Sequence, residues 1–95
     1  MIEIPLQSGA INSHQRFSIQ LGNNLVDFRL DWNYLYNRWL VNITIEGVAK
    51  LSGGVLAAGG TINRSVTDMG RLYFVGDDAT LDNLGQSNHL VWVDE

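Results

Sequence analysis

The chain has 95 residues, of which 45% are hydrophobic and 17% charged, and its net charge is −4 with no cysteine. This length and hydrophobic fraction favour one packed domain over residues 1–95, and the absence of cysteine excludes disulfide scaffolds, thiolate metal sites and cysteine nucleophiles. Six acids follow Thr67 against Arg71 as the only base there, and such an acidic surface argues against nucleic-acid binding.

Alternating apolar and polar residues, typical of half-buried strands, dominate the chain. The alternation is clearest at residues 26–32 and 38–46. The turn-prone residues 33–37 between them predict a β-hairpin with a loop of four or five residues. A second tight turn is expected at Glu46-Gly47. In chain order, strands are predicted at residues 2–6, 17–21, 26–32, 38–46, 48–51, 71–75 and 89–93.

Two segments lack the strand pattern. Residues 52–65 contain two glycine pairs and are compatible with a sharp bend, a bulged strand or a mobile loop. Residues 80–84 predict a short helical turn, with Thr80 as N-cap, Asp82 in the first turn and Gly85 as the stop. The predicted fold is therefore all-β: a small single-domain barrel or sandwich of about six to seven mostly antiparallel strands, with one short helical turn near residues 80–84.

The residues that could carry catalysis do not form a recognisable arrangement. His14 and His89 lie next to Ser13 and near Ser87, but no Gly-x-Ser-x-Gly turn is present. We interpret both histidines as exposed residues at strand ends. The sequence therefore predicts no catalytic residue, and a small hydrolase is the weakest of the functions considered.

Metal and cofactor sites are not predicted either. Asp77, Asp78 and Asp82 form the densest carboxylate group, and calcium binds such groups, but their spacing does not match an EF-hand. Turn formation is the favoured interpretation of these acids. The glycine pairs within residues 52–65 lack the lysine of a phosphate-binding loop, so no nucleotide cofactor is expected.

The aromatic residues around the predicted hairpin are the most informative group. Trp32 and Trp39 should face the same side as a cross-strand pair in the core. Tyr34 and Tyr36 lie in the loop, have less reason to be buried, and are the predicted interface residues because tyrosine is enriched in contact patches. A sugar-stacking platform is a weaker interpretation of the same residues.

The order of several motifs resembles one family. The most specific are the Trp32-Asn33 turn followed by Arg38-Trp39, and the Leu84-Gly85 turn before the last strand. The remaining motifs are Ile4-Pro5-Leu6, Phe17-Ser18-Ile19-Gln20-Leu21, Phe28-Arg29-Leu30-Asp31, Ile45-Glu46-Gly47, Leu72-Tyr73-Phe74-Val75 with Asp77-Asp78, and Leu81-Asp82-Asn83. This order is similar to that of the baseplate plug proteins of contractile-tailed bacteriophages and prophages. Residues 52–65 depart from the pattern.

The resemblance implies a baseplate-plug-like β domain over residues 1–95 that acts as a non-enzymatic structural subunit. Its location would be the tail baseplate of the virion, with the bacterial host cytoplasm as its location during assembly. Its partners would be other baseplate, hub or tail-tube proteins, and a homo-oligomer is also compatible. No nucleic-acid partner is expected, because the acidic surface would repel a phosphate backbone. No membrane partner is expected, since neither a signal peptide nor an apolar stretch of membrane-spanning length is visible.

The alternative from a different class is a small ligand-binding β module. It would bind carbohydrate or calcium through the aromatic hairpin at residues 32–39 and the acidic turn at residues 77–82.

Overall fold

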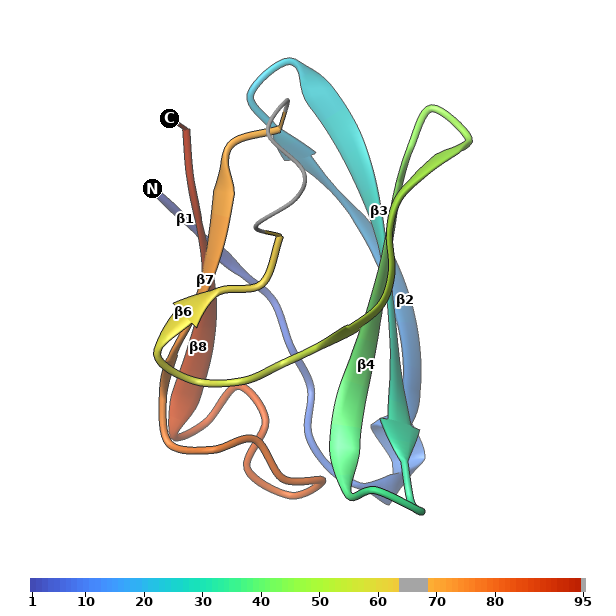
Figure 1. Cartoon of the computed structure of the whole chain (residues 1–95), viewed down its shortest axis with the longest axis vertical. Coiled ribbons are helices and arrows are strands. Elements are labelled where there is room, and N and C mark those ends of the chain that lie inside the picture. Colours follow the sequence, from blue (N-terminus) through green and yellow to red (C-terminus); the bar gives the residue numbers. More distant parts are fainter. Residues whose placement is uncertain (64–68, 95) are drawn as a thin grey trace.

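The computed structural model describes residues 1–63 and 69–94. Within them, eight strands form two four-stranded antiparallel sheets that lie face to face (Figure 1). In order across the first sheet, the strands are β2 (His14–Leu21), β3 (Asn24–Asn33), β4 (Arg38–Ile45) and β5 (Val48–Val55). In order across the second sheet, they are β1 (Ile2–Ile4), β8 (Asn88–Val93), β7 (Arg71–Gly76) and β6 (Gly60–Thr61).

The predicted all-β fold is confirmed, and of its two forms the structure has the sandwich. The two sheets do not close into a barrel, so β1, β2, β5 and β6 remain edge strands. The strands number eight rather than six or seven because the glycine-containing segment supplies the short strand β6. Its pairing with β7 is too short to leave an alternating pattern in the sequence.

The core lies between the sheets and follows from the alternation. Along β3 and β4, alternate residues are buried against the other sheet while their neighbours face outward. Both sheets contribute large side chains to this core, among them Phe28, Trp39, Val41, Phe74 and Leu90. Phe17 stacks on Phe28 with 5.2 Å between ring centroids, which extends the core toward the edge strand β2.

The turn that connects β3 to β4 is formed by residues that favour turns. Loop residues 34–37 join β3 to β4, and the Asn33 Oδ1 atom accepts hydrogen bonds from the backbone N–H groups of Leu35 (2.9 Å) and Tyr36 (3.1 Å). Such an asparagine side chain organises a turn in place of a backbone carbonyl. The predicted four- or five-residue hairpin loop is thus confirmed as a loop of four.

The helical turn expected near residues 80–84 is not a helix. Residues 81–87 form consecutive hydrogen-bonded turns, and among the described residues the only helix is a 3-10 turn at Ala10–Asn12. The predicted cap is present, because Thr80 Oγ1 accepts from Asn83 N (3.2 Å) while Asn83 Oδ1 accepts from Thr80 N (2.7 Å). The helix does not propagate because Gly85 adopts φ 78° and β8 begins at Asn88.

The segment at residues 52–65 is for the most part ordered strand and turn. β5 continues through Val55 with irregular register against β4, which agrees with the bulged-strand interpretation. The Gly53 N–H donates to the Asn42 Oδ1 atom at 2.9 Å, so a side chain from β4 supplies a bond in this irregular region. Residues 64 and 65 lie outside the described residues.

Candidate interaction surface at one end of the sandwich

Three chain segments meet at one end of the sandwich, which we call the loop end. They are residues 5–13, the hairpin loop 34–37 and the turns at 77–87 (Figure 1, bottom). The Gly9 N–H donates to the Leu81 carbonyl at 2.7 Å, and the Trp32 N–H donates to the Ser13 carbonyl at 2.7 Å. These bonds join segments that are distant in the sequence, so the loop end is one connected surface.

A pair of tryptophans forms the base of the hairpin loop. Trp32 and Trp39 are direct cross-strand partners, with ring centroids 5.5 Å apart and an edge-to-face arrangement. Trp39 is fully buried, and its Nε1–H donates to the Thr80 carbonyl at 3.0 Å. The predicted cross-strand pair in the core is confirmed, and it anchors the hairpin loop to the turns at 77–87.

The tip of the loop is apolar and exposed. The exposed fractions are 61% for Tyr34, 79% for Leu35 and 64% for Tyr36. The Tyr34 ring meets Trp32 edge-on at 6.3 Å, and the Arg38 guanidinium lies 5.7 Å from the centroid of the Tyr36 ring. The two tyrosines predicted as interface residues are therefore solvent-exposed and backed by ordered neighbours.

Two further apolar residues belong to this surface and were not predicted. Leu35 lies between the tyrosines, and Ile11, which is 92% exposed, lies on the 3-10 turn at the same end. Leu35 was detectable as an apolar residue in a turn. Ile11 carries no comparable signal, because only the fold brings residues 10–12 to the same end of the sandwich as the hairpin loop.

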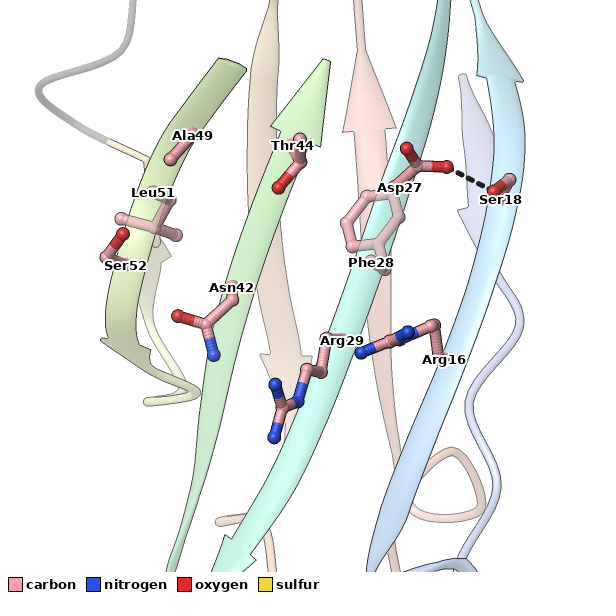
Figure 2. Close-up of a pocket in the computed structure, with 10 residues that line it drawn as sticks. All are labelled: Arg16, Ser18, Asp27, Phe28, Arg29, Asn42, Thr44, Ala49, Leu51 and Ser52. Atoms are coloured by element: carbon pink, nitrogen blue, oxygen red, sulfur yellow. Dashed lines mark hydrogen bonds between the residues drawn. The ribbon is translucent and has the colours of Figure 1, made fainter. Parts of the chain in front are cut away.

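The outward face of the β2–β5 sheet has a hollow of about 590 Å³ (Figure 2). Its polar lining comes from alternate outward positions of the strands. Arg16 and Ser18 lie on β2, Asp27 and Arg29 on β3, and Asn42 and Thr44 on β4. Ser18 Oγ donates to Asp27 Oδ1 across the strand pair. The sequence alone does not reveal this hollow, because strand register decides which side chains meet there.

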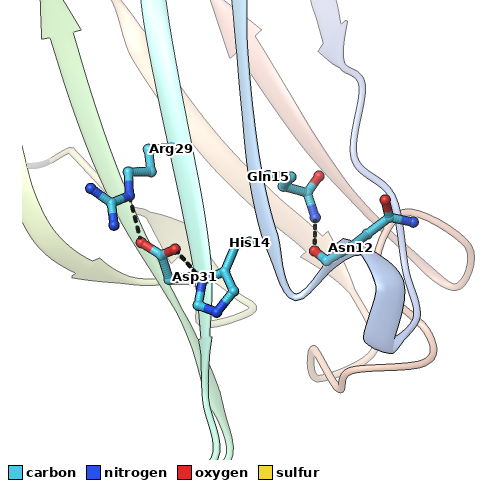
Figure 3. A network of polar contacts seen from close by, with 5 residues as sticks. All are labelled: Asn12, His14, Gln15, Arg29 and Asp31. Atoms are coloured by element: carbon cyan, nitrogen blue, oxygen red, sulfur yellow. Dashed lines mark hydrogen bonds and ion pairs between the residues drawn. The ribbon is translucent and has the colours of Figure 1, made fainter.

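Each histidine contacts a carboxylate. His14 Nδ1 lies 2.7 Å from Asp31 Oδ1, and Arg29 Nε lies 3.0 Å from the other oxygen of the same carboxylate (Figure 3). His89 Nδ1 lies 2.9 Å from Glu3 Oε2. Both imidazoles are on the surface, in agreement with their interpretation as residues at strand ends. Within residues 1–63 and 69–94, neither is hydrogen-bonded to a serine hydroxyl.

The acidic turn is organised by asparagines. Asn83 Nδ2 donates to the Asp78 carbonyl at 2.8 Å, and Asn88 Nδ2 donates to the Asp77 carbonyl at 3.2 Å. Across the described part of the chain, no group of three His, Asp or Glu side chains is placed to hold a metal ion. Asp77, Asp78 and Asp82 are therefore not brought together into such a group.

Comparison with known proteins gives one family. Over residues 1–95, the chain matches the family described as the cyanophage baseplate Pam3 plug gp18. No curated protein matches the sequence. The family match confirms the resemblance to baseplate plug proteins and supports a structural role in the tail baseplate, in association with other baseplate proteins. In the described residues, no helix has the length and apolar character needed to cross a membrane.

Proposed function

Because the chain belongs to the cyanophage baseplate plug family, we propose that it is a non-enzymatic subunit that packs against hub or tail-tube proteins through its loop end. The observation that supports this contact is the exposed apolar tip formed by Tyr34, Leu35 and Tyr36. Exposed apolar residues that gather at one place on a small domain mark interaction sites. The whole chain would act as one domain, first in the host cytoplasm and then in the virion.

The loop end has the properties of a preorganised contact. Asn33 fixes the backbone of the loop, and Trp32 and Arg38 contact the two tyrosine rings. Tyrosine loses little conformational entropy on binding and supplies both an apolar ring and a hydroxyl donor. Because the loop is already ordered, more of the contact free energy remains as affinity.

Replacing both tyrosines by alanine tests the proposal. We expect Tyr34→Ala with Tyr36→Ala to reduce incorporation into tail particles by tenfold or more, since truncating one anchor side chain costs about 1–2 kcal/mol of binding. The free energy of unfolding should change by less than about 1 kcal/mol, because both side chains are exposed. Quantitative mass spectrometry of purified particles measures the first quantity, and urea unfolding of the isolated protein measures the second.

A matched control removes exposed apolar side chains from the opposite end of the sandwich. Leu25 follows the β2–β3 turn and Val48 follows the β4–β5 turn, and both are exposed. Leu25→Ala with Val48→Ala should leave incorporation unchanged. Normal incorporation of the tyrosine double variant, or equal loss in both double variants, would refute the assignment of the loop end.

A further inference from the structure

Two arginines lie side by side on the outward face of the β2–β5 sheet. Arg16 and Arg29 are direct cross-strand partners, a placement in which like charges destabilise a strand pair. Asp31 compensates only part of this charge, because its two oxygens contact Arg29 Nε (3.0 Å) and His14 Nδ1 (2.7 Å). Among the described residues, no carboxylate forms an ion pair with Arg16, so the positive charge of its guanidinium is unmatched by a direct partner, although Asp27 lines the same hollow.

Both guanidinium groups border the hollow, together with neutral hydrogen-bonding side chains. Figure 2 shows Arg16 extending toward Arg29 from the neighbouring strand. The Asn42 Oδ1 atom is engaged by the Gly53 N–H at 2.9 Å, and the Asn42 nitrogen points away from β5 on the side of Arg29. The hollow therefore presents the planar fork of Arg16, the N–H donors of Arg29 that Asp31 does not engage, and one amide donor. Such a set matches an oxyanion with two oxygens.

We propose that this hollow binds a carboxylate side chain, aspartate or glutamate, from a neighbouring protein, with Arg16 and Arg29 donating to its two oxygens. The identity of that neighbour as a baseplate protein rests on the proposed function, whereas the carboxylate chemistry does not. A carboxylate would neutralise the unmatched charge and remove the repulsion between the two guanidiniums.

The charges around the hollow favour a single carboxylate over a polyanion. Asp27 lines the same hollow, and Asp31 lies beside Arg29. A nucleic-acid backbone would place further phosphates against these two carboxylates, and the protein as a whole carries a net charge of −4. One acidic side chain on an otherwise neutral protein surface needs only the arginine end of the hollow.

A peptide titration followed by NMR tests the proposal. The probe is a capped Gly-Gly-Glu-Gly-Gly peptide, with the same peptide carrying Gln in place of Glu as its control. We expect saturable shifts of the Nε–Hε resonances of Arg16 and Arg29 with the first peptide and none with the second. Arg16→Gln and Arg29→Gln should each weaken binding at least tenfold, and Arg16→Lys should weaken it less, because lysine keeps the charge without the planar fork.

Arg71→Gln is the matched control, since it removes the same charge from β7 in the other sheet, outside the hollow. It should change the affinity by less than twofold. Absence of saturable shifts, or equal weakening by Arg71→Gln, would overturn the proposal. Tighter binding of inorganic phosphate or of a single-stranded oligonucleotide than of the Glu peptide would overturn the carboxylate assignment. Because the titration uses the isolated chain, its result is independent of particle incorporation and separates this proposal from that of the loop end.

Discussion

Among single residues, Asn63 has the most demanding environment. It is fully buried, and its Oδ1 atom accepts hydrogen bonds from the Leu72 N–H and the Thr61 hydroxyl, both at 2.9 Å. Its Nδ2 group donates to the Gly70 carbonyl at 3.0 Å. One side chain thus joins the Thr61 side chain at the end of β6 to backbone groups at the start of β7, where the short strand pairing supplies few bonds of its own.

Removing this side chain should be costly. We expect Asn63→Ala to lower the free energy of unfolding by about 2–3 kcal/mol, because it leaves a buried donor and a buried acceptor without their partner. Asn23→Ala, at an exposed position in the β2–β3 turn, should change it by less than about 0.5 kcal/mol. Urea unfolding at 25 °C compares the two variants, and equal losses would contradict the role assigned to Asn63.

At the scale of elements, the hairpin between β4 and β5 shows how turn residues determine register. Ile45 pairs with Val48, and the two residues between them both have positive φ, 51° for Glu46 and 77° for Gly47. Two positive φ angles define the type I′ turn that suits the twist of a two-residue hairpin. Glycine adopts this conformation freely, whereas glutamate is strained by its Cβ atom.

The strain at Glu46 predicts a stabilising substitution. Glu46→Asn should raise the free energy of unfolding by about 1 kcal/mol, because asparagine tolerates the left-handed region. Gly47→Ala should lower it by about 1 kcal/mol for the opposite reason, and a Cβ there would meet no atom within 4 Å, so a clash does not contribute. Thermal unfolding of both variants checks the two signs, and a loss of stability in Glu46→Asn would contradict the turn assignment.

At the scale of the whole molecule, strand position sets local stability. β3 lies between β2 and β4, and β8 lies between β1 and β7, whereas β5 is an edge strand with irregular register. A central strand opens only when both neighbours separate from it, while an edge strand can open alone. The sandwich should therefore be most resistant to opening at β3 and β8.

Hydrogen exchange measures this difference directly. We expect the hydrogen-bonded amides of β3 and β8 to exchange only through global unfolding, at least 100-fold more slowly than those of β5. Exchange followed by NMR in heavy water gives the rate for each amide. Similar rates in all three strands would show that the edge strand opens only together with the rest of the sandwich.

The sequence alone determined the local structure and the family. Side chains alternate along a strand whatever the strand packs against, so the alternation at residues 26–32 and 38–46 predicted both the strands and their buried faces. Glu46-Gly47 and the asparagines at 33 and 37 predicted turns, because those conformations depend on the residues themselves. The order of these motifs also carried the resemblance to baseplate plug proteins, which the family match confirms.

Only the tertiary structure decided how distant segments meet. The Trp39–Thr80 hydrogen bond spans 41 residues, and the pairing of Arg16 with Arg29 likewise depends on strand order and register. The cap at Thr80 is a local signal and is present, but no helix follows it, because β8 begins at Asn88. Local preferences act over a few residues, whereas contacts between sheets depend on the packing of the whole core, and so the sandwich, the loop end and the hollow emerge only in three dimensions.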